Sequence, residues 1–182
     1  MKDKVRDYIS LLLLAGTIIA FDQWTKSIIR TQLAFGDTWV PWDWLEPYAR
    51  IVYWHNSGAA FGFGQNLSLL FTILPFIVVA AILAYYHQIP RSDWPLRIAL
   101  GLQLGGAVGN LIDRLTIGYV TDFISVGTFP VFNVADSAIS IGVVVLLVGM
   151  WIMERKQKNE IVLEERLPNS EPPLSRKDLQ GE

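Results

Sequence analysis

The sequence contains no cysteine and only two histidines among its 182 residues. Without cysteine there can be no disulfide bond, no zinc site built on thiolates and no cysteine nucleophile. The sequence also lacks an H-E-x-x-H zinc motif, a phosphate-binding loop ending in Gly-Lys and a G-x-G-x-x-G dinucleotide signature. These absences exclude the thiol-based, zinc-protease and nucleotide-binding chemistries that such motifs support.

Charge is scarce as well, since 18% of the residues are charged and 52% are hydrophobic. More than half of the charged side chains lie in residues 1–7 and 154–182, and the mean hydropathy is +0.34. The net charge of -2 and the dispersed basic residues provide no positive surface for nucleic acid, which we exclude as a partner. This balance favours a membrane protein with charged ends.

Four apolar stretches are close to the roughly 20 residues that a membrane-spanning helix needs. They predict an all-α membrane protein with four transmembrane helices, at about residues 8–29, 67–86, 96–115 and 135–153. We interpret residues 1–158 as a single transmembrane catalytic domain and residues 159–182 as a charged, disordered tail. Lys and Arg gather at the two termini and in the second loop, which predicts that both termini are cytoplasmic.

The loop after the first helix is rich in aromatic residues, with six of them between Trp39 and Trp54. Such rings prefer the level of the lipid headgroups. The segment Arg50 to Trp54 has strand propensity and is followed by the turn sequence Asn56-Ser57-Gly58. We therefore predict a small extended element on the outer membrane surface, serving either as a plain anchor or as a cover over a substrate.

Ionisable residues within membrane spans are costly and point to a function. Asp22 and Lys26 are four residues apart on the first helix, so we expect an ion pair that fastens the outer end of this helix to its neighbours. Asn110 and Asp113 share a face of the third helix, and Arg114 can reach a carboxylate or a lipid phosphate. We expect these three residues mainly to organise a site, with direct chemistry as the alternative.

Asp122 and Asp136 differ from these because no Lys or Arg occurs between Arg114 and Arg155. Helix capping alone could explain Asp136. If the two carboxylates meet, however, like charges about 4 Å apart repel by about 4 kcal/mol at an effective dielectric constant of about 20, so the pair would share one proton. An aspartic peptidase needs this state, in which one carboxylate activates water and the other donates a proton. Both residues flank one short loop on the same side of the membrane.

Three other functions are compatible with parts of this pattern. A Ser-His-Asp triad using His55 and Ser57 lacks the sequence context of a nucleophile elbow. A small proton-coupled transporter or lipid carrier would use the membrane carboxylates as a proton relay. A non-catalytic assembly subunit would use the glycine-rich third helix for packing.

Five motifs, taken in order, resemble those of signal peptidase II, the bacterial lipoprotein signal peptidase. They are Phe-Asp-Gln-Trp-Thr-Lys at 21–26, Asn-Ser-Gly-Ala-Ala-Phe at 56–61, Gly-Gly-Ala-Val-Gly-Asn at 105–110 followed by Asp113-Arg114, Val-Thr-Asp-Phe at 120–123 and Phe-Asn-Val-Ala-Asp at 132–136. The resemblance covers residues 8–153.

This resemblance implies an aspartic endopeptidase of the bacterial inner membrane, with no cofactor and no metal. Its partners would be membrane lipid and diacylglyceryl-modified prolipoproteins, which it would cut before the lipidated cysteine at the outer (periplasmic) interface. Asp122 and Asp136 match the catalytic residues of the family. Positions that line the family's site are matched by Asn56, Asn110, Arg114 and Asn133, and its supporting polar positions by Asp22, Lys26 and Asp113.

Overall fold

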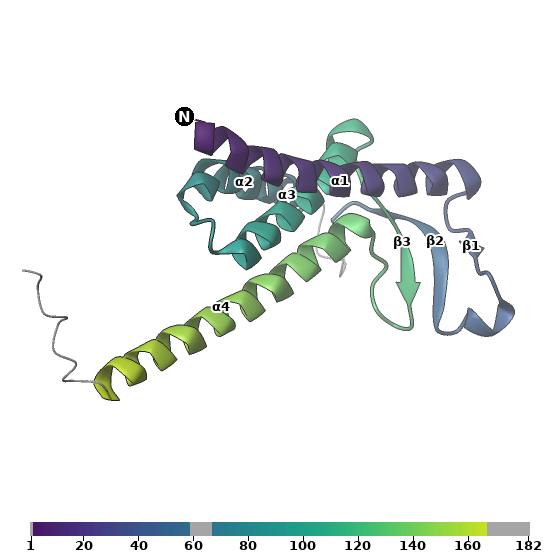
Figure 1. The fold of residues 1–182 in the computed structure, drawn as a ribbon. Coiled ribbons are helices and arrows are strands. Elements are labelled where there is room, and N and C mark those ends of the chain that lie inside the picture. Colours follow the sequence, from purple (N-terminus) through teal and green to yellow (C-terminus); the bar gives the residue numbers. More distant parts are fainter. Residues whose placement is uncertain (1, 59–66, 167–182) are drawn as a thin grey trace, which may run out of the picture. The chain divides into compact units, whose positions relative to one another are not determined.

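The computed structural model describes residues 2–58 and 67–166, and their elements are drawn in Figure 1. In chain order the elements are α1 (Lys2–Gln32), β1 (Thr38–Trp39), η1 (Asp43–Leu45), β2 (Ala49–Asn56), α2 (Leu67–Tyr85), η2 (Tyr86–Gln88), α3 (Trp94–Thr116), β3 (Val120–Val126) and α4 (Val134–Arg166). Each of the four predicted helices is therefore present. The helices α1 and α4 extend beyond the apolar stretches from which they were predicted.

The disorder predicted from residue 159 is wrong for residues 159–166, because α4 continues to Arg166. The segment 154–166 contains no glycine or proline and is rich in Glu, Lys, Arg and Gln, which favour helix. Lys156 and Glu160, one turn apart, approach to 3.9 Å. The rest of the predicted tail, residues 167–182, lies outside the described residues.

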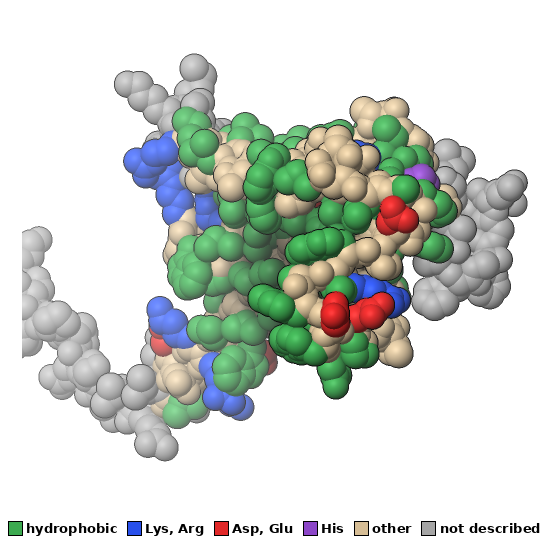
Figure 2. Space-filling view, turned by 90° about the vertical axis from the view of Figure 1, so that its right-hand side faces the viewer, with side chains coloured by type: hydrophobic (Ala, Val, Ile, Leu, Met, Phe, Trp, Pro, Cys, Tyr) green, Lys and Arg blue, Asp and Glu red, His purple; other side chains and the backbone are tan. Residues whose placement is uncertain are grey.

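Three helices in the described part of the chain are long and apolar enough to cross a membrane, at Tyr8–Gln32, Leu70–Gln88 and Val134–Val162. Their surfaces expose large hydrophobic side chains such as Leu13, Ile77 and Leu147, as expected of lipid-facing helices. Figure 2 shows one face of the molecule largely covered by hydrophobic side chains, with charged groups in separate spots. The chain is accordingly a membrane protein.

The helix α3 has 23 residues but is not among the helices apolar enough to cross a membrane, so the predicted fourth span is not confirmed. Its buried residues are mostly glycine, alanine and leucine, together with Asn110 and Asp113. A helix surrounded by protein does not need a lipid-facing apolar surface, which explains its composition.

Glycines let α3 approach its neighbours closely. A Cβ atom added at Gly105 would lie 2.7 Å from Cβ of Ile18 on α1, and one added at Gly106 would collide with the carbonyl oxygen of Ala135 on α4. The small residues predicted to let this helix pack closely thus contact two neighbours, α1 and α4.

A three-stranded antiparallel sheet with the order β1-β2-β3 completes the fold. The extended element predicted in the aromatic loop is confirmed as β1 and β2. The sheet also recruits β3 from the connection between α3 and α4, so the all-α class that we expected omits a real part of the structure. Trp54 pairs with Asp122, and Asn56 pairs with Val120. This register brings the loop after α1 beside the strand that carries Asp122.

Candidate active site

Asp136 is fixed by the helix start on which it lies. Asn133 is the residue before α4, and its side-chain Oδ1 accepts a hydrogen bond from the backbone N–H of Asp136 (3.0 Å). In return the carboxylate of Asp136 accepts one from the backbone N–H of Asn133 (3.1 Å). This reciprocal arrangement is a capping box, which satisfies two otherwise free N–H groups and orients the Asp136 carboxylate. The prediction that helix entry accounts for Asp136 is therefore correct for part of its role.

Asp122 lies on β3 and is 1% exposed. Its two carboxylate oxygens accept hydrogen bonds from the side-chain amides of Asn133 (2.7 Å) and Asn56 (2.8 Å). Asn56 is held in turn by a tight turn, in which its Oδ1 accepts a hydrogen bond from the N–H of Gly58 at 2.9 Å. Gly58 has a positive φ of 82°, which a glycine adopts without strain.

Asn133 thus contacts both carboxylates, one through its backbone and one through its side chain. Burial, together with the negative charge of Asp136, raises the pKa of Asp122 from its ordinary value of 3.8 to about 6. The hydrogen bonds from Asn56 and Asn133 oppose this shift because they favour the ionised form. The negative charge of Asp136 therefore acts directly on the protonation of Asp122.

Asn110 of α3 connects this pair to a set of buried charges. Its amide donates to Asp136 (2.8 Å), while its Oδ1 accepts from the ammonium of Lys26 (2.9 Å) and from the amide of Asn133 (3.1 Å). Because every polar atom of this side chain but one amide hydrogen has a partner, its orientation is determined. Asn110 is therefore the junction between the aspartates and the first helix.

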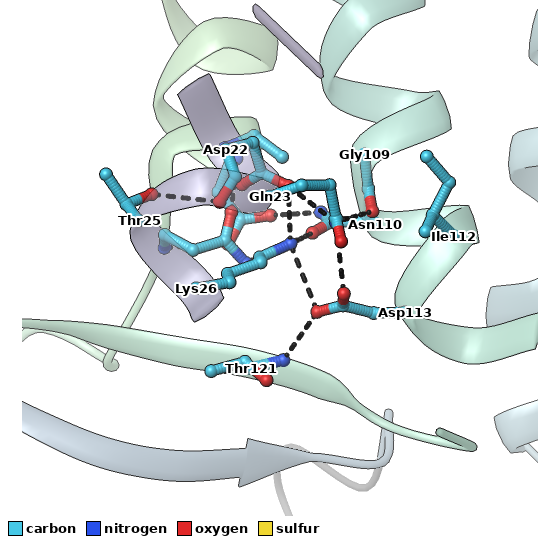
Figure 3. Close-up of polar contacts among 12 residues, drawn as sticks. Asp22, Gln23, Thr25, Lys26, Gly109, Asn110, Ile112, Asp113 and Thr121 are labelled. Carbon is cyan, nitrogen blue, oxygen red and sulfur yellow. Dashed lines mark hydrogen bonds and ion pairs between the residues drawn. The ribbon is translucent and has the colours of Figure 1, made fainter. Parts of the chain in front are cut away.

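The ion pair predicted on the first helix is present and is wholly buried. The Nζ of Lys26 lies 2.8 Å from the carboxylate of Asp22 and 3.3 Å from that of Asp113 on α3 (Figure 3). Both carboxylates also accept backbone hydrogen bonds from other elements. Asp22 accepts from the N–H of Ala135 (3.0 Å), and Asp113 accepts from the N–H of Thr121 (3.0 Å).

These two backbone contacts explain what the buried charges do. Ala135 directly precedes Asp136, and Thr121 directly precedes Asp122. The cluster of Asp22, Lys26 and Asp113 thus holds the backbone next to each aspartate of the pair. These contacts place the cluster, from α1 and α3, where it can position both residues.

Two residues that the sequence analysis did not select complete the cluster. The amide of Gln23 donates to Asp113 and to the carbonyl oxygen of Gly109, both at 3.0 Å. Arg30 approaches Asp113 at 3.3 Å and donates to the hydroxyl of Thr121 at 3.1 Å. The sequence could have indicated Arg30, because it follows Lys26 by four residues and therefore lies on the same face of the helix.

Arg114 is half-buried and lies within the electrostatic reach of three carboxylates, those of Asp136, Asp122 and Asp113. Together with Asn110 it forms one end of a cavity of about 320 Å³, whose other walls are mostly apolar and come from α2, α3 and α4. A cationic group and an amide at one end of an apolar cavity suit a ligand that is polar at one end and apolar at the other.

The alternative triad finds no support in the geometry. The imidazole of His55 stacks on Tyr119 with ring centroids 3.7 Å apart and also packs against Phe35. Within the described residues its buried Nε2 has no hydrogen-bond partner, so nothing connects it to Ser57. Residues 2–58 and 67–166 likewise contain no group of three His, Asp or Glu side chains that could hold a metal ion.

Comparison with known proteins gives one consistent result. Residues 14–152 match the model of the family described as signal peptidase (SPase) II. The lipoprotein signal peptidase of Moorella thermoacetica is 44% identical over 149 residues, covering 82% of this chain and 97% of that protein. The corresponding protein of Geobacillus thermodenitrificans is 41% identical over 150 residues, covering 80% and 92%.

Solved structures agree. A bacterial membrane enzyme determined by the in meso method at 1.9 Å resolution superposes with a TM-score of 0.70 at 32% identity, covering 78% of this chain and 92% of that one. A second bacterial membrane enzyme, determined at 2.3 Å, gives a TM-score of 0.68 at 28% identity and covers 91% and 94%.

Proposed function

This chain belongs to the signal peptidase II family of membrane peptidases, and from that premise we propose that it is an aspartic endopeptidase that cuts diacylglyceryl-modified prolipoproteins just before the lipidated cysteine. The observation that carries the proposal is the contact of Asn133 with both Asp122 and Asp136. The two carboxylates are joined through one residue, and the buried one, Asp122, has a pKa raised to about 6 by burial and by the charge of Asp136. Such a pair suits a reaction that needs one ionised and one protonated carboxylate.

The pair performs hydrolysis by general acid and base catalysis. The ionised carboxylate takes a proton from a water molecule as the water oxygen attacks the scissile carbonyl carbon. The protonated carboxylate hydrogen-bonds the carbonyl oxygen, on which negative charge develops, and a proton is then supplied to the leaving nitrogen as the C–N bond breaks. Asp136 is partly exposed and Asp122 is buried, so water reaches the pair from the side of Asp136.

Substrate binding falls to the polar residues around the pair. Asn56 and Asn110 have amide groups beside the two carboxylates, and Arg114 provides a positive charge at one end of the apolar cavity. These groups suit the backbone carbonyls of an extended peptide at the level of the site. The lipid chains of the substrate fit the apolar walls of the cavity and the surrounding bilayer.

The proposed function also fixes the orientation of the chain in the inner membrane. We place α1, α2, α3 and α4 across the bilayer with both termini in the cytoplasm, because Lys and Arg are concentrated near those ends. The sheet and the aspartate pair then lie at the periplasmic interface, where a prolipoprotein presents its cleavage site.

A proton-coupled transporter is the competing function, and the geometry disfavours it. A relay needs titratable groups along a path across the membrane. Here the carboxylates gather at one end of α1, α3 and α4, and those of Asp22 and Asp113 are bound to the ammonium of Lys26.

The decisive test is cleavage of a diacylglyceryl-modified prolipoprotein peptide by the purified protein in detergent, with and without EDTA. We expect cleavage by the wild type that EDTA does not affect, and loss of cleavage in both Asp122→Asn and Asp136→Asn. The exposed Asp43 offers a matched control, since Asp43→Asn changes charge equally and should leave cleavage intact. If the wild type fails to cleave under conditions in which a relative cleaves, the assignment falls.

A further inference from the structure

The apolar cavity contains one polar side chain that the proposed chemistry does not use, that of Gln103. The cavity walls come from hydrophobic residues of α2 and α4, such as Leu74, Val78 and Ile139, and from one face of α3. Gln103 lies on that face seven residues before Asn110, which stands at the end nearest the aspartate pair. Seven residues are two helical turns, which separates Gln103 from Asn110 by about 10 Å along α3.

The amide of Gln103 has no hydrogen-bond partner among residues 2–58 and 67–166. Its side chain runs past Gly142 of α4, where an added Cβ would lie 3.0 Å from its Cγ. The glycine therefore makes room for a long side chain at this depth. Gln103 is half-buried on the wall of the apolar cavity, so its amide is available to a hydrogen-bonding group of a bound molecule.

We propose that the amide of Gln103 donates a hydrogen bond to an ester carbonyl of the substrate's diacylglyceryl group, and so selects ester-linked lipid. This inference rests on the proposed function and adds a specificity-determining residue to it. The position of Gln103, two helical turns from Asn110, determines which part of the substrate it can reach.

The spacing fits this part of the lipid. Six bonds lead from the cysteine Cα through the thioether and the glyceryl group to an ester carbonyl carbon, which is the length of two extended residues, roughly 7 Å. A hydrogen bond of about 3 Å added to this length equals the distance of about 10 Å along α3 between Asn110 and Gln103. The cysteine can therefore sit at the aspartate pair while its ester reaches Gln103.

The signal peptide is a poorer partner for this amide. A helical peptide in a membrane satisfies its own backbone carbonyl groups through internal hydrogen bonds. An ester carbonyl accepts hydrogen bonds but has no donor of its own within the lipid. The free donor of Gln103 and the free acceptor of the ester are thus complementary.

The test compares two substrates that differ only in this carbonyl. One prolipoprotein peptide carries the natural diester on its cysteine, and the other carries a dialkyl ether of the same chain length. We expect the wild type to show a KM about tenfold higher for the diether, with kcat unchanged, because one neutral hydrogen bond is lost. In Gln103→Met, which keeps the length of the side chain but has no donor, the KM for the diester should rise to that of the diether.

Ile139→Val is the matched control, because it alters the wall of the same cavity without touching an amide. It should change the KM of the two substrates by the same factor. Equal KM values for both substrates in the wild type, or a preference for the ester that survives in Gln103→Met, would overturn the proposal while leaving the peptidase assignment intact. If the wild type cleaves neither substrate, the proposed function itself fails and this inference falls with it.

Discussion

Asn133 and Asp136 hydrogen-bond to each other in both directions, each through its backbone N–H and its side chain. This mutual contact begins α4 and at the same time orients a carboxylate of the proposed catalytic pair. The side-chain NH2 group of Asn133, which takes no part in this contact, donates a hydrogen bond to Asp122. A helix cap and a catalytic contact are thus combined in one residue, which allows the two roles to be separated by mutation.

Asn133→Ser should separate them. Serine caps a helix about as well as asparagine, but its short hydroxyl cannot also donate to Asp122. We expect the thermal unfolding midpoint in detergent to stay near that of the wild type, while kcat for prolipoprotein cleavage falls by about a hundredfold. Asn133→Ala should lose activity to a similar extent and also about 1 kcal/mol of stability. Equal stability loss in both variants would show that the cap does not depend on the side-chain oxygen.

The pH dependence of cleavage should report the shared proton. The pKa of Asp122 is raised to about 6. Because catalysis needs one proton on the pair, kcat/KM should decline as the pH rises through about 6. The hydrogen bond from Asn56 lowers this pKa, so Asn56→Ala should move the decline to higher pH and reduce the maximum rate. A decline that stays at the same pH in Asn56→Ala would contradict the role given to this contact.

Stability should depend on pH through the same residue. The pKa of Asp122 is higher in the folded chain than its ordinary value of 3.8. Its contribution to stability is therefore complete below about pH 4 and is lost as the pH rises through about 6, by at most about 3 kcal/mol. Thermal unfolding measured from pH 4 to pH 7 should show this loss in the wild type and in Asp43→Asn, and a flatter profile in Asp122→Asn. Parallel profiles in all three proteins would refute it.

Removal of the buried ammonium should destabilise the fold strongly. Lys26→Met leaves the carboxylates of Asp22 and Asp113 buried without their shared cation, which costs about 3–5 kcal/mol. Lys156 is the matched control, because its contact with Glu160 is 3.9 Å long and both side chains are mostly exposed. Lys156→Met should leave the unfolding midpoint almost unchanged. Comparable effects of the two mutations would argue against a structural role for the buried cluster.

Two glycine-to-alanine mutations should have opposite effects. At Gly106 the new Cβ would meet the carbonyl oxygen of Ala135, a backbone atom that no side-chain rotation can move away. Gly106→Ala should therefore cost about 1–3 kcal/mol and misplace the start of α4. At Gly16 an added Cβ has no atom within 4 Å, and alanine favours helix by about 0.5–1 kcal/mol. Unfolding midpoints measured side by side will show whether helix approach explains the glycine pattern.

Much of this arrangement could be predicted from the sequence, because it depends on local patterns. The apolar lengths predicted four helices, and the spacing of Asp22 and Lys26 predicted their ion pair. The absence of nearby cations singled out Asp122 and Asp136 before any geometry was known. The sequence Asn-Val-Ala-Asp at 133–136 even carries the spacing of a capping box, although its full meaning depends on where Asp122 lies.

The rest depends on contacts between distant segments, which local patterns do not encode. Strand β3 pairs with a strand more than 60 residues earlier, so the sequence of either strand alone does not predict their pairing. The roles of Gln23 and Arg30 likewise come from partners on α3 and β3. The extension of α4 to Arg166 was missed because charge was taken as a sign of disorder, whereas Glu, Lys and Arg also favour helix.

The backbone contacts of Asp22 with Ala135 and of Asp113 with Thr121 bear on how the enzyme is made. The parts of the site are distributed over the whole order of synthesis, since α1 and α3 supply the buried charges, β3 one aspartate and α4 the other. A chain still entering the membrane therefore carries at most one aspartate of the pair and only part of its support. On the proposed mechanism, proteolytic activity therefore requires that α4, the last helix to be made, has docked against the others.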